Sequence, residues 1–109
     1  MSFAEGSYRI EKAWLVSRGQ RIPLESTEID ISVAGSGEVS VFASVHMKAK
    51  VPGLSPGASD IQVVLEWEGE SLCIAEARVF DVDLHLSGET TVQLTGRLER
   101  LDEEGAKKA

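Results

Sequence analysis

The sequence has 109 residues, a formal net charge of −7, 42% hydrophobic residues and 27% charged residues. This length and composition predict a single globular domain that can bury a core without a structural metal or disulfides. No apolar stretch approaches the roughly 20 residues needed to cross a bilayer. The acidic balance, with no cluster of Lys and Arg, argues against nucleic acid or an anionic membrane surface as a partner.

The N-terminal residues and the one cysteine bear on the location of the protein. The first residues lack the basic and apolar regions of a signal peptide, and Cys73 has no second cysteine for an internal disulfide. We therefore expect a buried Cys73 and a cytoplasmic protein, or a virion component assembled in the cytoplasm. The domain is expected over residues 1–101, followed by a flexible charged tail over residues 102–109.

The first predicted strand covers residues 7–16. Its apolar positions Tyr8, Ile10, Trp14 and Val16 fall on one face, which predicts that Trp14 belongs to the core. A turn leads to a short segment over residues 21–25. Pro23 has no N–H to give to a ladder, so this segment is expected at a sheet edge or outside the sheet.

The clearest β-hairpin joins residues 27–34 to residues 39–51 through a Gly-Ser-Gly turn. In the second segment every other residue is apolar, a period of two that fits a strand and no helix. Phe42 and His46 lie on its polar face. The first segment is the shorter one, so we expect the end of the long strand to need another strand as its neighbour.

A loop with two Pro-Gly pairs occupies residues 52–59, and alternating strands are expected over residues 60–68, 71–87 and 90–101. In the middle one the apolar parity changes between Ala75 and Val79. Because a slip of one residue turns every side chain to the other face, this change predicts a β-bulge or sharp bend. The predicted fold is all-β, an antiparallel β-sandwich or barrel of about six to eight strands with long hairpins.

The best candidate for site chemistry is a run in the second of these strands, residues 71–87. Asp81, Asp83 and His85 share one strand face, and two carboxylates with an imidazole suit a divalent cation. His46 is a conceivable further ligand. The same pattern is typical of the solvated face of an amphipathic strand, so we favour that interpretation and predict no metal, no cofactor and no enzymatic activity.

Residues 79–94 alternate apolar and polar side chains around a Gly turn. This stretch is similar to the closing hairpin of phage tail-tube-type β proteins, over less than a fifth of the chain. The similarity implies a phage or phage-tail-like component as one specific form of a structural protein.

The expected function is a non-catalytic structural or protein-interaction domain, a subunit of a homo- or hetero-oligomeric assembly, because long strands leave edges and faces that a partner can cover. The alternative is a small-ligand or carbohydrate-binding β-domain that uses Trp14, Trp67 or Phe42 and the Pro-Gly loop. A metal-dependent enzyme is the weakest hypothesis. The residues expected to contact a partner are Phe42, His46, Pro52, Leu54 and Pro56.

Overall fold

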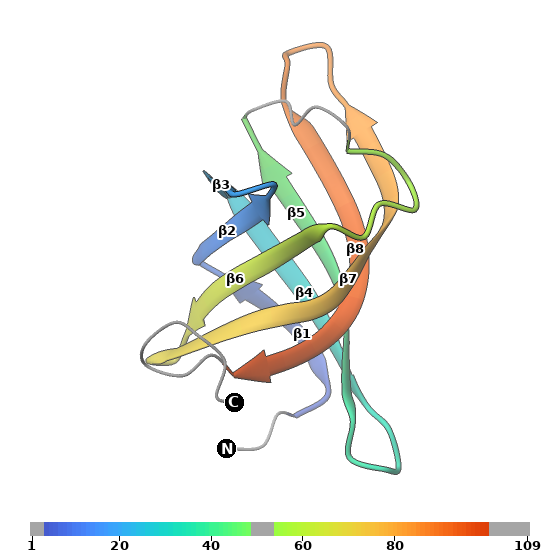
Figure 1. Cartoon of the computed structure of the whole chain (residues 1–109). Coiled ribbons are helices and arrows are strands. Elements are labelled where there is room, and N and C mark those ends of the chain that lie inside the picture. Colours follow the sequence, from blue (N-terminus) through green and yellow to red (C-terminus); the bar gives the residue numbers. More distant parts are fainter. Residues whose placement is uncertain (1–3, 49–53, 101–109) are drawn as a thin grey trace.

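The structure, a computed structural model, describes residues 4–48 and 54–100. These residues form eight strands: β1 (Gly6–Ile10), β2 (Lys12–Ser17), β3 (Gln20–Pro23), β4 (Ser26–Val33), β5 (Val39–Met47), β6 (Ile61–Trp67), β7 (Glu70–Leu84) and β8 (Thr90–Arg100). They make one antiparallel sheet in the order β1-β4-β5-β8-β7-β6-β2-β3. The sheet curls into a half-barrel around the core (Figure 1), which confirms the predicted all-β antiparallel fold. None of the described residues belongs to a helix capable of spanning a bilayer.

The N-terminal segment turns a corner at Glu11 and contributes one strand to each half of the curled sheet. β1 pairs with β4, whereas β2 pairs with β6 and β3. The prediction of one strand over residues 7–16 is therefore wrong. Beyond the corner the buried residues are Ala13, Leu15 and Ser17, so Trp14 lies on the outer face. The bend reverses the alternation, which a period-two pattern read across it cannot reveal.

A second corner lies in β7, where its pairing with β8 shifts register between Ala75 and Arg78 and again between Val79 and Asp81. Glu76, inside the first shift, has a positive φ of 53°. The predicted irregularity between Ala75 and Val79 is thus confirmed. It allows the N-terminal part of β7 to pair with β6, while the loop residues Gly57 and Ala58 hydrogen-bond to Val79.

The core fills the concave side of the sheet. Alternate residues of the central strands are almost fully buried there; the largest are Leu15, Ile29, Met47, Leu65, Leu72, Ile74 and Leu94. Cys73 is buried, as predicted. Trp67 packs on the rim of this core against Tyr8, with ring centroids 4.8 Å apart.

Edges and turns follow their local sequences. β3, which ends at Pro23, lies at one edge of the sheet as predicted. The long strand β5 is paired with β4 on one side and with β8 on the other, so Met47 faces Thr90. The predictions for residues 49–53, including Pro52, and for the tail over residues 102–109 lie outside the described residues.

Candidate functional site

The outer, convex face of the sheet carries rows of side chains, because cross-strand partners point to the same side. The registers of β1, β4, β5 and β8 define three rows: Ser7, Asp30, Phe42 and Thr95; Arg9, Glu28, Ser44 and Gln93; and Ser26, His46 and Thr91. Most of these side chains are short and polar. Phe42 is the exception, and its place on this polar face agrees with the prediction from the alternation of its strand.

Phe42 does not stand alone on this face. Phe80, the extra residue of the second bulge in β7, meets it edge to face with ring centroids 6.2 Å apart. Phe80 is 65% exposed. Edge-to-face aromatic pairs are favourable in themselves, but they bury little apolar area when the rings stay in solvent. The pair is therefore a preformed apolar feature on an otherwise polar surface. We call these two residues the aromatic pair.

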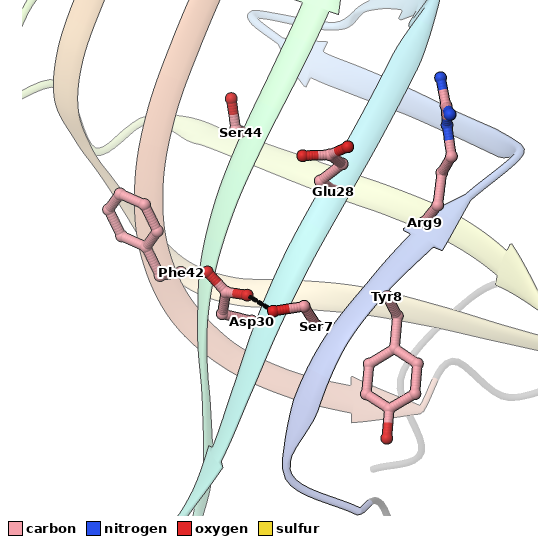
Figure 2. A pocket seen from close by; sticks show the side chains of 7 residues that line it. All are labelled: Ser7, Tyr8, Arg9, Glu28, Asp30, Phe42 and Ser44. Atoms are coloured by element: carbon pink, nitrogen blue, oxygen red, sulfur yellow. Dashed lines mark hydrogen bonds between the residues drawn. The ribbon is translucent and has the colours of Figure 1, made fainter.

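A depression of about 460 Å³ adjoins Phe42 on the side of β1 and β4. Figure 2 shows Phe42 and Arg9 at opposite sides of it, with Glu28 and Asp30 between them. Ser7 Oγ donates a hydrogen bond to Asp30 Oδ1, and both residues line the depression. The hollow thus offers carboxylate, hydroxyl and guanidinium groups next to the Phe42 ring, with Tyr8 as a further lining residue.

A second, shallower depression of about 360 Å³ lies on the other side of Phe42. It is lined by Asp30, Phe42 and Thr95, together with small residues of the strands around them: Ser32, Ser40 and Gly96. Small residues beside a large one leave Phe42 as a ridge between two hollows. Such a surface can receive side chains or a flat ring on either side of the aromatic.

A hydrogen-bonded chain of four side chains lies where β5 meets the β7–β8 hairpin. A carboxylate only accepts, so His46 Nε2 donates to Glu89 Oε1 over 2.7 Å. In neutral His46 the other ring nitrogen, Nδ1, then accepts from Thr91 Oγ over 3.0 Å. The same hydroxyl accepts from His85 Nε2 over 2.9 Å. The chain ties the protruding hairpin to the body of the sheet.

The order carboxylate, imidazole and hydroxyl also occurs in hydrolase triads. Here Thr91 lies in β8, an interior strand paired with both β5 and β7, so the backbone N–H groups around it belong to ladders. Acyl transfer needs free N–H donors aimed at the developing oxyanion. We therefore assign this chain of hydrogen bonds a role in positioning the hairpin.

The residues considered from the sequence as weak metal-site candidates are only partly brought together. His85 comes close to His46, with ring centroids 5.8 Å apart, through their shared contact with Thr91. Asp81 and Asp83 are exposed. Within residues 4–48 and 54–100, no three His, Cys, Asp or Glu side chains gather closely enough to hold a metal ion.

Of the other predicted contact residues, His46 shares the outer face with Phe42, whereas Leu54 and Pro56 belong to the loop before β6. Leu54 is half-buried against the core, and Pro56 is exposed in the loop that crosses to β7. Trp14, an expected ligand-binding residue, lies under the guanidinium of Arg21, whose Cζ is 4.6 Å from the ring centroid. The interaction residues named from the sequence therefore do not form one continuous surface.

Three residues of the outer face were not singled out by sequence reasoning: Phe80, Glu89 and Thr91. Glu89 and Thr91 resemble any hairpin residues in the sequence, and only the register brings them to His46. The signal for Phe80 was its place directly after the predicted bulge. Because a bulge changes which face the following side chains occupy, the alternation alone could not assign Phe80 to the inner or the outer face.

Comparisons with protein-family models, with curated proteins and with solved structures each gave no match. The interpretation of this surface consequently rests on its own geometry.

Proposed function

We propose that this chain is a non-catalytic protein-interaction domain and a subunit of a homo- or hetero-oligomeric assembly, with the outer face around Phe42 as its contact surface. The observation that carries the proposal is the aromatic pair, in which Phe80 is exposed and Phe42 is half-buried. Aromatic residues dominate the few positions that supply most interface energy. Phe42 and Phe80 already hold each other edge to face, so less side-chain freedom is lost when a partner covers them.

The surroundings of the aromatic pair fit the same function. Short polar side chains such as Ser44 and Thr95 flank it, the charged Asp30 lies directly opposite Phe42, and Arg78 stands further out in the same row. An apolar centre with a polar rim is the usual organisation of an interface between proteins. The net charge of −7 favours a protein partner over nucleic acid or an anionic membrane surface.

A finer form of this proposal is a phage or phage-tail-like component that acts in the cytoplasm or in a virion assembled there. Its support is the similarity of residues 79–94 to the closing hairpin of tail-tube-type proteins. This hairpin projects beyond the body of the sheet (Figure 1), where a neighbouring subunit could contact it.

A small-ligand or carbohydrate-binding function is the second candidate. It is favoured by the two hollows that flank Phe42, whose volumes of about 460 and 360 Å³ fall in the range of small-molecule sites. A sugar ring can stack on an aromatic ring while carboxylates and hydroxyls such as those of Asp30 and Ser44 bind its hydroxyl groups.

Site-specific photo-crosslinking tests the leading proposal. A photoreactive phenylalanine analogue replaces Phe42 in cells that produce the protein, and the matched control carries it at Val64, a half-buried outer-face position on β6. We expect a discrete crosslinked protein from position 42 and none from position 64. If position 42 gives no protein adduct and NMR titration with glycans shifts the Phe42 and Asp30 signals, the second candidate function replaces the first.

A further inference from the structure

Exposed apolar side chains gather at the end of β7 and in the hairpin that follows it. Of the four large hydrophobic residues exposed in the described part of the chain, three lie between residues 80 and 86. Phe80 is 65% exposed, Leu84 62%, and Leu86 fully so. Phe80 lies on the outer face with Phe42, whereas Leu84 lies on the other face of the sheet, at the end of the unpaired part of β7. Exposed apolar side chains of this size beside an open strand edge favour an interaction site.

The same stretch has a backbone edge that no described residue pairs with. His85 N–H donates to the carbonyl of Glu89, so this facing pair is hydrogen-bonded. Hydrogen-bonded and non-hydrogen-bonded pairs alternate in antiparallel ladders. Val82 and Leu84 therefore belong to non-hydrogen-bonded pairs with β8, and their N–H and C=O groups point away from it. β6 covers β7 only as far as Ile74.

Charge determines what can add to this edge. Asp81 and Asp83 lie on the outer face, opposite Gln93 and Thr91, and neither takes part in an ion pair within the described residues. A second copy added antiparallel along the edge would bring these carboxylates against their own counterparts, which destabilises a sheet. A strand with Lys or Arg on that face would complement them.

We propose that the free edge of β7, residues 81–84, binds an extended segment of a partner protein by strand addition, and that this segment alternates basic and apolar residues. The basic side chains face Asp81 and Asp83, and the apolar ones continue the face that carries Val82 and Leu84. Main-chain hydrogen bonds supply affinity and the alternating side chains supply specificity. The proposal rests on the protein-interaction function, but it uses a surface other than that around Phe42.

Three synthetic peptides test the proposal on the full chain by fluorescence polarisation. The first alternates Val and Lys over eight residues, and the second alternates Val and Glu. The third is the Val-Lys peptide with an N-methyl group on each Val. This change keeps the charge but removes the hydrogen-bond donors of the peptide edge that would face β7. We expect only the first to bind. Equal binding of the methylated peptide would overturn strand addition, and tighter binding of the Val-Glu peptide would overturn the charge assignment.

Two variants locate the binding. Val82→Pro removes an outward N–H while leaving the ladder with β8 intact, and we expect it to weaken binding at least about tenfold. Asp81→Lys with Asp83→Lys should reverse the preference in favour of the Val-Glu peptide. The control Glu11→Lys with Glu66→Lys makes the same charge change at exposed positions elsewhere. If the control reverses the preference equally, binding is not at this edge.

If Val82→Pro fails to fold, the double variant Asp81→Lys with Asp83→Lys still tests the proposal, because it should reverse the preference between the Val-Lys and Val-Glu peptides. A dimer seen by sedimentation and abolished by Val82→Pro would overturn the basic partner in favour of a second copy. Loss of peptide binding with persistent crosslinking from position 42 would refute this inference and leave the proposed function standing. Peptide binding without a crosslink from position 42 would refute the contact surface around Phe42 and leave this inference standing.

Discussion

Gly96 is the position at which a single added carbon should do the most damage. A Cβ built there would lie 2.5 Å from Ile74 Cγ2, 2.7 Å from the carbonyl oxygen of Ala75 and 3.3 Å from Ala77 Cα. Two of these atoms belong to the backbone of the first bulge, and Ile74 is completely buried. None can move aside without shifting β7 against β8.

The expected cost of Gly96→Ala follows from these contacts. Overpacking of this kind costs about 1–3 kcal/mol, and backbone contacts place it near the upper end. The reduced freedom of the unfolded chain returns about 0.4–1 kcal/mol. We therefore expect a loss of about 2 kcal/mol in the free energy of unfolding, or roughly 8 °C or more in Tm for a domain of this size.

Urea unfolding followed by tryptophan fluorescence, together with calorimetry, measures this loss. Gly35→Ala is the matched control, because no atom lies within 4 Å of a Cβ at Gly35. We expect the control to stay within about 0.5 kcal/mol of the parent protein. If Gly96→Ala unfolds at the same urea concentration as Gly35→Ala, the inference that β7 approaches β8 too closely at the bulge to admit a Cβ is refuted.

Three other changes have expected outcomes. Glu68 precedes Gly69 in a two-residue hairpin turn, and both residues have positive φ. Because Asn tolerates this conformation better than Glu, Glu68→Asn should raise the free energy of unfolding in urea by about 0.5 kcal/mol. A lower free energy of unfolding would contradict that turn geometry. Thr91→Val removes the hydroxyl between His46 and His85 and should lower the free energy of unfolding by about 1 kcal/mol. It should also speed amide exchange in the β7–β8 hairpin. Unchanged exchange would contradict the role of this hydroxyl in positioning the hairpin. Leu65→Ala, at a fully buried position, should cost about 2–5 kcal/mol in calorimetry, and a smaller loss would mean that the core can collapse around it.

Much of the fold could be predicted because alternation records which face of a strand is buried. The hairpin of β4 and β5, the edge position of Pro23 and the bulge after Ala75 all follow from local pattern and backbone chemistry. The pattern gave a wrong result at Glu11. There the strand bends and its two halves join opposite parts of the sheet, so residues that share a parity no longer share a face.

The candidate site was less accessible to sequence reasoning. Phe42 was found because a large aromatic interrupts a polar face, which is a local signal. Its partner Phe80 lies far away along the chain, and the register of three strands, together with a bulge, sets the distance between them. The His46 cluster has the same origin, since Glu89 and Thr91 reach it only through the pairing of β5 with β8.

The sequence by itself determined that this protein is built from alternating antiparallel strands, because side-chain period and turn chemistry are properties of neighbouring residues. Strand order, the curl of the sheet, the aromatic pair and the free edge of β7 were decided only by the tertiary structure. They depend on which distant strands share hydrogen bonds and in what register. Residues of similar local pattern can satisfy many such pairings, and only packing of the common core selects one.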